Sequence, residues 1–544
     1  MKYGSRALLL VLIGLLAASL AWSSGQGEAA ATGEKVKITM FMGNSGVAQP
    51  AGVDPSDNWA INIIEKYANV DLEIEIPNYT DFATKCNLLL ASGNLPDIVH
   101  SWIIADMIKA ADAGAFLDLK AFWDKSPVMQ KAAPALHMEV VRDQTTTKRY
   151  WAIPMNQGNR EPGWGVIVRQ DLIEKYNGGK YPEDVQGYLN WFKAIKAAIP
   201  DSIPYASRTS GAYLFVNSAS IWAMYGIWGG YPTTNVFRNG KYYHALGVPE
   251  FKEAVKIYRQ MYQDGLLDKE FATNPPDAYF SKLTNKYVAT QTNDIDQILP
   301  TVGNQIEQNA KNSPPTPGVY WVYAPPLTRY PAGVERKYIQ WLGSDMFPVQ
   351  GGHRVVISAK TKYPAQAWKV LEGWASDELY DAIAWGREGK EYNVVNGKRV
   401  PTARLYFNDV NDPDSHYWTL HLGIIRGFWP TEVKYEVQRL KAPAEFEKVY
   451  QSSRWLVQDA KATGLSPGNY RPTFPDNNAK FAEALASAVQ IQAKTIAGEM
   501  SLEEFDVAVK DWRSKYDFMV DVVNKWDADH RAELKSKGVK IFDQ

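Results

Sequence analysis

Residues 150–171 read YWAIPMNQGNREPGWGVIVRQD, and this stretch decides how the rest of the chain is organised. The apolar run 150–155 predicts a strand, the Gly- and Pro-containing run 156–163 predicts a loop, and residues 164–169 predict a second strand. Asp171 then suits the N-cap of a helix. Amide, guanidinium and indole side chains occur together here, and they suit a polar ligand with apolar faces. We therefore expect the chain to cross between two lobes at this point, beside a binding cleft.

The composition excludes several classes of protein. The chain has 544 residues, more than one hydrophobic core usually serves, so two or more domains are expected. Its 59 basic and 60 acidic residues nearly cancel, and no basic surplus favours nucleic acid. The 19 Trp, 30 Tyr and 19 Phe residues suit binding to flat, hydroxylated or apolar ligand surfaces. The single cysteine, Cys86, excludes an internal disulfide and a Cys-based zinc site, and its helical setting predicts a buried thiol.

The N-terminus has the pattern of a secretory signal peptide, covering residues 1–23. Lys2 and Arg6 precede an apolar run that is shorter than the roughly 20 residues of a membrane span, and small residues follow it. No cysteine follows the run, so a thioether-linked lipid anchor is not expected. Residues 24–35 are rich in small and polar side chains and predict a flexible tether. We expect an exported, soluble protein of the periplasm or cell surface, with retention as an uncleaved anchor as the weaker alternative.

Residues 35–102 predict strand, helix, strand, helix and strand, which is a doubly wound α/β unit. Two of its strands end in polar or aromatic tips, marked by Asn44 and Trp102. In open α/β sheets ligands bind outside the carboxyl ends of the strands, so both tips are candidate contacts. Further along, Asn239-Gly240 predicts the turn of a hairpin, and residues 481–496 and 502–526 predict long helices.

Four further segments are distinctive. They are GNLPDI (93–98), VIVRQDLIEKY (166–176) followed by YPED (181–184), AWGREGKEYNVV (384–395) and IAGEMSLEEF (496–505). In their order and spacing they resemble the extracellular solute-binding proteins of carbohydrate ABC transporters, the LplA-like group. The resemblance spans nearly all of the mature chain. The missing lipid-anchor cysteine departs from the anchored members and puts tethering in doubt, not the fold.

The resemblance implies an α/β protein with the two-lobed, type II periplasmic-binding-protein fold. Each lobe would be an α/β sandwich, and a hinge would let the lobes close on a sugar, probably an oligosaccharide by the size and Trp content of the chain. The N-terminal lobe is expected to hold residues 36–155 plus about 345–400, and the C-terminal lobe residues 156–344 plus about 401–544, with the first crossing at Met155–Asn156. Such a protein is expected to be a monomer that hands its ligand to membrane permease subunits, without a cofactor and without catalysis.

Sugar recognition needs aromatic faces for the apolar faces of the ring, together with planar polar groups for the hydroxyls. Aromatic and polar side chains at predicted element ends meet this need best. The candidate ligand contacts are Asn44, Trp102, Asn156, Arg160, Trp228, Asn293, Asp294, Trp341, Asp345, Trp385 and Arg387. Tryptophans inside apolar or helical patterns are expected in the core instead. These are Trp164, Trp222, Trp368 and Trp374.

Two other classes of function stay open. A secreted glycoside hydrolase would also be Trp-rich and would place two carboxylates about 5–10 Å apart across a cleft, for which Asp345 and Glu388 are candidates. Glu388 could instead order its loop beside Gly389. Fingerprints for a serine nucleophile elbow, a P-loop and a dinucleotide site are absent from the sequence. An adhesion or scaffold module would predict neither small-ligand affinity nor lobe closure.

No metal is expected. The oxygen-rich run 409–414 (DVNDPD) could hold Ca²⁺, but it lacks the 12-residue spacing with a terminal Glu, so a solvated turn is the better interpretation. His416 and His421 are five residues apart, which does not place both on one helix face, and no His-Glu-x-x-His motif is present.

Overall fold

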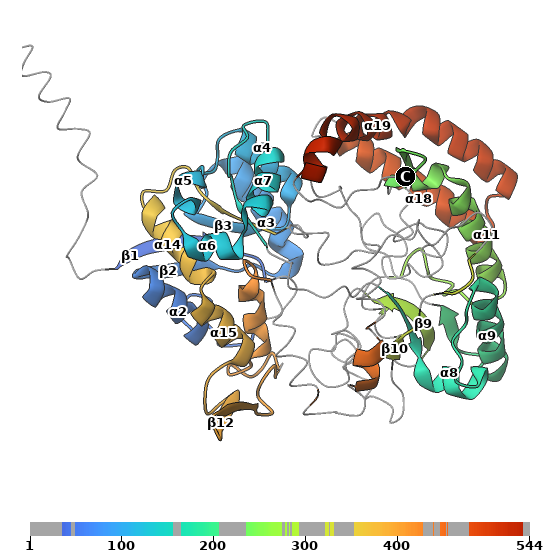
Figure 1. Cartoon of the computed structure of the whole chain (residues 1–544), viewed down its shortest axis with the longest axis horizontal. Coiled ribbons are helices and arrows are strands. Elements are labelled where there is room, and N and C mark those ends of the chain that lie inside the picture. The colour runs from blue at the N-terminus through green and yellow to red at the C-terminus, as the bar shows by residue number, and fades with distance from the viewer. Residues whose placement is uncertain are drawn as a thin grey trace, which may run out of the picture.

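The computed structural model places most of the chain in two groups of elements that lie side by side (Figure 1). The residues that it describes are 35–44, 49–155, 165–205, 235–274, 278–279, 282, 286–292, 321–325, 327–330, 353–407, 409–427, 439, 447–452, 454 and 478–536. Within these ranges, no helix combines the length and the apolarity needed to cross a membrane.

The first lobe is built on a five-stranded sheet in the order β2-β1-β3-β11-β4. These strands are β2 (Val70–Glu75), β1 (Val36–Phe41), β3 (Ile98–Ser101), β11 (Arg354–Ile357) and β4 (Ile153–Pro154). β1 pairs in parallel with both β2 and β3, as the alternation of strands and helices predicts. β11 arrives from a distant part of the sequence and pairs antiparallel with β3 and β4. The sheet is therefore completed only when the chain returns.

Helices cover this sheet because their apolar residues recur on one side. In α2 (Trp59–Ala68) the buried residues are Ala60, Ile61, Ile64 and Ala68, and the Asn58 side chain caps the first turn by accepting from two backbone N–H groups. The other helices of the lobe are α3 (Tyr79–Ser92), α4 (Ile104–Asp112), α5 (Lys120–Trp123), α6 (Pro127–Ala132), α7 (Ala135–Asp143), α14 (Pro364–Trp374), α15 (Asp377–Trp385) and the 3-10 helix η5 (Tyr417–Gly423). A hairpin of β12 (Tyr392–Val395) and β13 (Lys398–Pro401) projects from this lobe (Figure 1).

The second lobe has a four-stranded sheet in the order β10-β5-β9-β6. Its strands are β10 (Trp321–Tyr323), β5 (Gly165–Arg169), β9 (Tyr287–Thr292) and β6 (Ile203–Tyr205). Around it lie α8 (Gln170–Asn177), α9 (Val185–Ala198), the hairpin of β7 (Asn235–Arg238) and β8 (Lys241–His244), the 3-10 helix η1 (Ala245–Gly247), α11 (Pro249–Gln263), α18 (Asn478–Ala497) and α19 (Leu502–Ser536). The predicted hairpin turn is confirmed, since Asn239 and Gly240 both have positive φ.

The opening stretch connects the two lobes. Met155 packs in the hydrophobic core of the first lobe, whereas Val168 packs in that of the second. The chain therefore changes lobe between Met155 and Gly165, an interval that contains the predicted crossing. The second change of lobe comes later than predicted. Leu405 and Ile425 still lie in the first core, so the predicted boundary at about residue 401 is wrong by at least 24 residues.

Two local predictions for the opening stretch also need correction. Only Ile153–Pro154 pairs as a strand, because the carbonyl of Tyr150 accepts instead from the N–H of Leu119 outside the sheet. Asp171 is not the N-cap, because α8 already begins at Gln170. The Asp171 carboxylate instead accepts from the guanidinium of Arg169, at 2.6 and 2.7 Å, and so ties the end of β5 to the first turn of the helix.

Candidate ligand-binding site

The strongest candidate site lies at one edge of the first sheet. β1 ends just before Gly43 and Asn44, and β3 ends just before Trp102. β11 runs the other way, so the residue that precedes it, His353, lies at the same edge. Two of the predicted contacts, Asn44 and Trp102, are thus brought to the edge where open α/β sheets bind ligands.

Trp102 is held at this edge by its neighbours. Its half-buried ring stacks on Phe82 with ring centroids 3.8 Å apart, and Tyr79 lies at 5.8 Å. The backbone of Gly43 approaches so closely that a Cβ there would lie 2.2 Å from a ring carbon of Trp102. Only glycine fits in that position without displacing the indole. An indole that is fixed in place and partly open to solvent suits a stacking contact with a ligand.

A chain of hydrogen bonds fixes the backbone of the same loop. The N–H of Gly43 donates to Nδ1 of His100 at 3.2 Å, so Nε2 of His100 carries the ring proton. This nitrogen lies 2.9 Å from Nδ1 of His353 and donates to it, and the two rings stack within 5° of parallel. Burial holds the pKa of His100 well below its usual value. Burial and then the charge of Arg354 lower the pKa of His353 to about 4, so both rings are neutral at pH 7.

The edge is also joined to the point where the chain leaves the lobe. The carbonyl of His353 accepts from the N–H of Met155 at 3.2 Å and from Nη1 of Arg354 at 2.9 Å. Arg354 is buried, its Nη2 reaches Oε1 of Gln144 at 3.4 Å, and burial lowers the pKa of its guanidinium to about 10. Movement of the crossing at Met155 would therefore act directly on the loop that supports the histidine pair.

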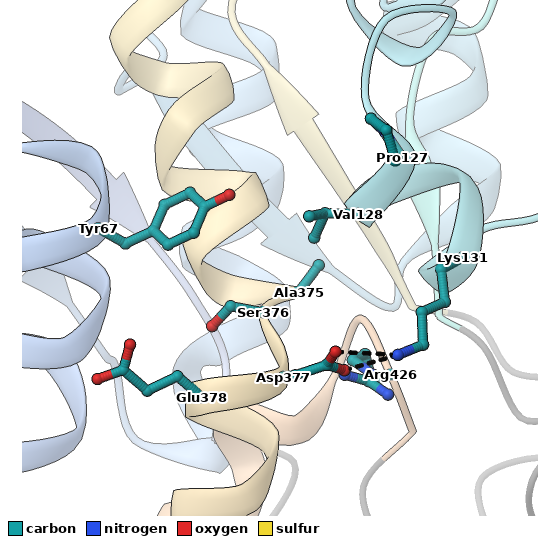
Figure 2. A pocket seen from close by; sticks show the side chains of 9 residues that line it. All are labelled: Tyr67, Pro127, Val128, Lys131, Ala375, Ser376, Asp377, Glu378 and Arg426. Carbon is teal, nitrogen blue, oxygen red and sulfur yellow. Dashed lines mark hydrogen bonds and ion pairs between the residues drawn. The ribbon is translucent and has the colours of Figure 1, made fainter.

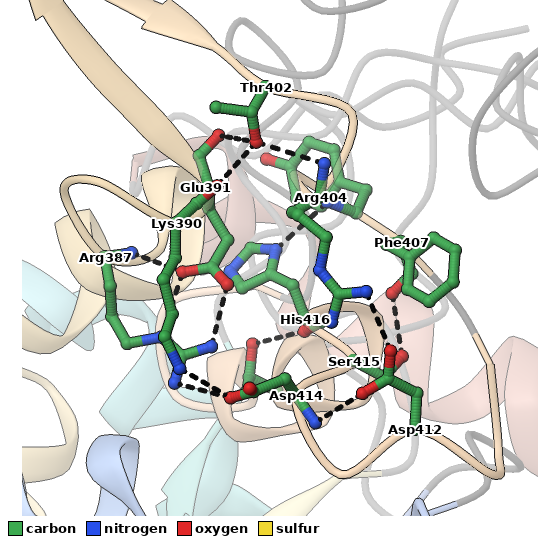
Figure 3. A network of polar contacts seen from close by, with 12 residues as sticks. Arg387, Lys390, Glu391, Thr402, Arg404, Phe407, Asp412, Asp414, Ser415 and His416 are labelled. Carbon is green, nitrogen blue, oxygen red and sulfur yellow. Dashed lines mark hydrogen bonds and ion pairs between the residues drawn. The ribbon is translucent and has the colours of Figure 1, made fainter.

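Arg387 lies elsewhere, in a network of charges at the base of the β12–β13 hairpin (Figure 3). Its guanidinium donates to both oxygens of Glu391, at 2.7 and 3.0 Å, and to Asp414 at 3.2 Å. Glu391 is fully buried, and its carboxylate also accepts from the backbone N–H of Arg387 at 2.7 Å. The structural role that we suggested for Glu388 thus belongs to Glu391. The donors of Arg387 are engaged by carboxylates of its own lobe.

Trp385 anchors the same hairpin. Its half-buried ring meets Tyr392 edge-on, with centroids 6.0 Å apart, and the guanidinium of Arg399 lies 5.5 Å above it. Arg399 is held in place by two hydrogen bonds to Asp381, at 2.7 and 2.8 Å. A cation over a tryptophan face is a favourable contact in its own right. The geometry therefore supports a packing role for Trp385.

The other predicted contacts fall outside the described residues. They are Asn156, Arg160, Trp228, Asn293, Asp294, Trp341 and Asp345, and the predicted core residues Trp164 and Trp222 fall there too. Trp368 and Trp374 are described, and their predicted place in the core is confirmed, with exposed fractions of 4% and 3%. Cys86 is fully buried as predicted, 3.3 Å from the hydroxyl of Ser101.

The oxygen-rich run 409–414 forms turns whose carboxylates pair with cations. Asp412 accepts from Arg404 at 2.7 Å, and Asp414 accepts from Lys390 at 2.8 Å. Over the described part of the chain, no three His, Cys, Asp or Glu side chains gather as they would around a metal ion.

Sequence reasoning missed His100, His353 and the need for glycine at position 43. His100 sits in the same predicted strand as Trp102, which offered a signal, since a histidine at the end of a buried strand needs a polar partner. Nothing in the sequence pairs it with His353, which lies 253 positions away. Only the antiparallel return of β11 brings the two rings together.

Comparison with known proteins agrees with this architecture. The sequence model of a family described as bacterial extracellular solute-binding protein matches residues 59–386, more than half of the chain. The chain belongs to this family. A relative within it, lipoprotein LipO of Bacillus subtilis (strain 168), is 24% identical over 44% of the chain, and the alignment spans 47% of LipO. The chain thus spans about half the length of that relative.

Two further similarities cover nearly the whole solute-binding chain. The polygalacturonan/rhamnogalacturonan-binding protein YtcQ of Bacillus subtilis (strain 168) is 22% identical over 94% of this chain and 95% of its own length. The solved structure of an HMO-binding, ABC-transporter-associated solute-binding protein from Bifidobacterium longum infantis ATCC 15697 superposes with a TM-score of 0.68. It covers 90% of this chain and 98% of its own, at 17% identity. The predicted two-lobed fold of type II solute-binding proteins is confirmed.

Proposed function

We propose that this solute-binding protein captures a carbohydrate outside the cytoplasm and delivers it to the permease of an ABC transporter, without chemically changing it. Its relative YtcQ is named for binding polygalacturonan and rhamnogalacturonan. The structural neighbour from Bifidobacterium is named for binding HMO and for its association with an ABC transporter. These proteins support a glycan as the ligand and a permease as the partner.

The observation that carries the proposal is the fixed indole of Trp102 at the edge of the sheet where β1 and β3 end. The ring supplies an apolar face for a sugar, whose hydroxyl groups also need planar polar partners. Asn44 is the predicted polar contact at this edge. Residues of the second lobe would complete the site when the lobes close. Trp228, Asn293 and Asp294 are the contacts that the sequence predicts for that set.

Closure requires that the ligand bind the closed form more tightly than the open form. The hydrogen bond from Met155 to His353 supports a mechanism for this preference. A ligand that stacks on Trp102 favours one conformation of the loop that contains Gly43. Through the histidine pair and Met155, that conformation favours one conformation of the segment that connects the two lobes. We further propose that the mature protein is a monomer, exported after removal of residues 1–23.

The direct test is titration calorimetry of the purified mature protein against neutral and acidic oligosaccharides. A chromatographic time course with the same sugars runs alongside. We expect saturable binding of at least one glycan without product. Steady release of shorter sugars would support a glycoside hydrolase instead, and no heat with any sugar would support a scaffold module. X-ray scattering with and without the bound glycan then tests closure, for which we expect a smaller radius of gyration.

A further inference from the structure

A second aromatic ring lies beside Trp102 at the same edge of the sheet. β2 runs parallel to β1 and reaches this edge at Glu75, whose carbonyl accepts from the N–H of Met42 at 3.0 Å. Four residues later, Tyr79 begins helix α3. The centroid of its ring lies 5.8 Å from that of Trp102, and 57% of the residue's surface is exposed. Most of the Tyr79 side chain therefore faces solvent beside the candidate ligand contact.

Helix α3 positions two rings against the indole. Tyr79 is the first residue of this helix of 14 residues, so the helix fixes where its side chain starts. Phe82, one turn further on, is buried and stacks on Trp102 with centroids 3.8 Å apart. A tyrosine side chain has only two main torsions to fix, so a ligand that packs on Tyr79 loses little free energy to ordering.

The angle between the rings decides what they can bind. The planes of Tyr79 and Trp102 are inclined by 31°. A sugar ring stacks with its apolar face parallel to an aromatic ring, so one sugar residue cannot lie flat on both planes. The next residue of a glycan can lie on the second ring. The Tyr79 hydroxyl has no hydrogen-bond partner among the described residues, so it is also open to a sugar hydroxyl.

Another exposed tyrosine of the first lobe has different surroundings. Tyr67 lines a cavity of about 370 Å³ between α2, α6 and α15 (Figure 2). The ammonium of Lys369 lies 6.0 Å over its ring, and both cations of the cavity lining pair with Asp377. The groups around Tyr67 are thus engaged by charges of the same lobe. The ring contact of Tyr79 is with a neutral indole, and no described cation lies over its face.

Resting on the proposed function, we infer that Tyr79 is a second stacking surface, which makes the protein prefer ligands of at least two linked sugar residues. Trp102 contacts one sugar residue, and Tyr79 contacts the neighbouring residue of the same glycan. A monosaccharide gains only the contact with Trp102, whereas a disaccharide gains both contacts for the cost of binding one molecule. The first lobe therefore favours an oligosaccharide before the second lobe closes on it.

Titration calorimetry with sugars of increasing length tests this inference. The probes are galactose with its linear di- and trisaccharide, and galacturonic acid with its linear dimer and trimer. If neither series binds, the oligosaccharide that binds wild type in the calorimetric screen replaces them, together with its fragments of one and two residues. We expect wild type to bind the disaccharide at least about tenfold more tightly than the monosaccharide.

Tyr79→Ala removes the second ring. We expect it to raise the Kd of the di- and trisaccharide about tenfold and to leave the Kd of the monosaccharide unchanged. Tyr79→Phe keeps the ring, and its Kd should stay within about threefold of wild type at every length. The Tm of Tyr79→Ala should equal that of wild type, because the lost ring is largely exposed.

Tyr363→Ala is the matched control. Tyr363 is also an exposed tyrosine at the start of a helix of the first lobe, α14. It lies at the opposite edge of the sheet, because the hydroxyl of nearby Thr361 donates to Asp97, just before β3, at 2.6 Å. This variant should leave the Kd of every sugar unchanged.

Two outcomes would overturn the inference while leaving the proposed function intact. The first is an unchanged Kd for every oligosaccharide in Tyr79→Ala. The second is an equal loss of affinity for monosaccharide and oligosaccharide, or a lowered Tm, since Tyr79 would then act only by supporting the indole. If wild type binds no sugar of any length, the proposed function itself has failed.

Discussion

Trp102 and Trp385 both follow or end a regular element, both are half-buried, and both are predicted to touch ligand, yet they sit in different surroundings. Trp102 is packed among rings at the edge of the sheet that forms the candidate ligand-binding site. Trp385 lies at the base of a projecting hairpin, with the guanidinium of Arg399 over its face. A tryptophan whose face is covered by an ion-paired arginine acts as an anchor. One that is fixed by neutral rings can offer its remaining surface to a ligand.

The same contrast holds for the polar groups beside each ring. At the Trp102 edge the histidine pair is neutral, and hydrogen bonds set its orientation. At the hairpin, a buried carboxylate and an arginine neutralise each other. The first arrangement fixes a loop through neutral rings. In the arrangement at the hairpin, the donors of Arg387 pair with carboxylates of the same lobe. Four experiments test whether the region around Trp102 binds ligand while the region around the hairpin only stabilises the fold.

The largest effect is expected from Glu391→Ala. The change leaves the Arg387 guanidinium without its fully buried partner, and breaking a buried ion pair typically costs about 3–5 kcal/mol in free energy of unfolding. Urea denaturation measures this loss. Asp414→Ala removes an exposed partner of the same arginine and is expected to cost less than about 1 kcal/mol. A weaker glycan affinity in Glu391→Ala, with the fold intact, would show that the hairpin belongs to the ligand site.

Acid is expected to weaken both regions. Burial lowers the pKa of His353 and of His416 to about 4, whereas an unfolded histidine titrates near its usual value of 6.5. Between these values the unfolded chain binds more protons, so stability is full above about pH 6.5 and falls as pH drops toward about 4. Each ring contributes a loss of about 3 kcal/mol over that window.

Urea denaturation from pH 7 to pH 4 tests this expectation. The variants His353→Gln and His416→Gln should each remove part of the acid loss. Only His353→Gln should also weaken glycan binding at pH 7, because His353 supports the edge loop through His100. The pKa of Glu391 is lowered despite burial, chiefly by its bonds to Arg387, so its contribution persists at pH 4.5 and is lost below that value. A flat profile between pH 7 and pH 5 would contradict the assigned neutral rings.

Gly43→Ala tests how tightly Trp102 is held. The new methyl group would lie 2.2 Å from one carbon of the indole and 2.8 Å from a carbon of Phe82, so the stack must shift. Overpacking of this kind costs about 2–3 kcal/mol, and we expect the loss in both folding and glycan affinity. The double variant Gly43→Ala/Trp102→Ala is the control, since alanine should cost less at position 43 once the indole is gone and the Phe82 ring can shift into the space that it leaves. Additive losses would mean that the two residues do not act through each other.

The smallest expected effect separates the two tryptophans directly. Trp102→Ala should weaken glycan binding by about 2 kcal/mol, or about 30-fold in Kd, because it removes the aromatic surface on which we propose that the sugar stacks. Trp385→Ala should leave Kd unchanged and lower the Tm, because it removes the support of the hairpin. Calorimetry and thermal unfolding of both variants measure this. Equal losses of affinity in the two variants would contradict the assignment of Trp102 as a ligand contact and of Trp385 as a packing residue.

Much of the fold follows from local sequence. The alternation of β2 and the spacing of Ile61 and Ile64 in α2 each make one face apolar, and such a face must be buried wherever it lies. The turn at Asn239-Gly240 needs only the backbone freedom of two residues. The segment 402–425 was misassigned because its apolar residues suit either core. Which core receives them depends on the path of the chain.

The candidate site was predicted only in part. Asn44 and Trp102 were expected at one edge of the sheet because each follows a strand and the ends of neighbouring parallel strands share an edge, and their role as ligand contacts stays a prediction. Arg387 was predicted as a contact from its residue type and its neighbours in sequence, which carry no information about Glu391 as a buried partner. A guanidinium at an element end suits a sugar and a carboxylate equally well.

The sequence by itself therefore determined the elements, the apolar faces and the family, because these depend on residues close together in the chain. Tertiary structure alone decided which polar and aromatic residues lie together. The return of β11 places His353 against His100 across 253 positions, and the packing of Gly43 against Trp102 fixes the indole. Both contacts join residues that are distant in sequence. Their energies depend on geometry at the scale of one ångström, which no local pattern specifies.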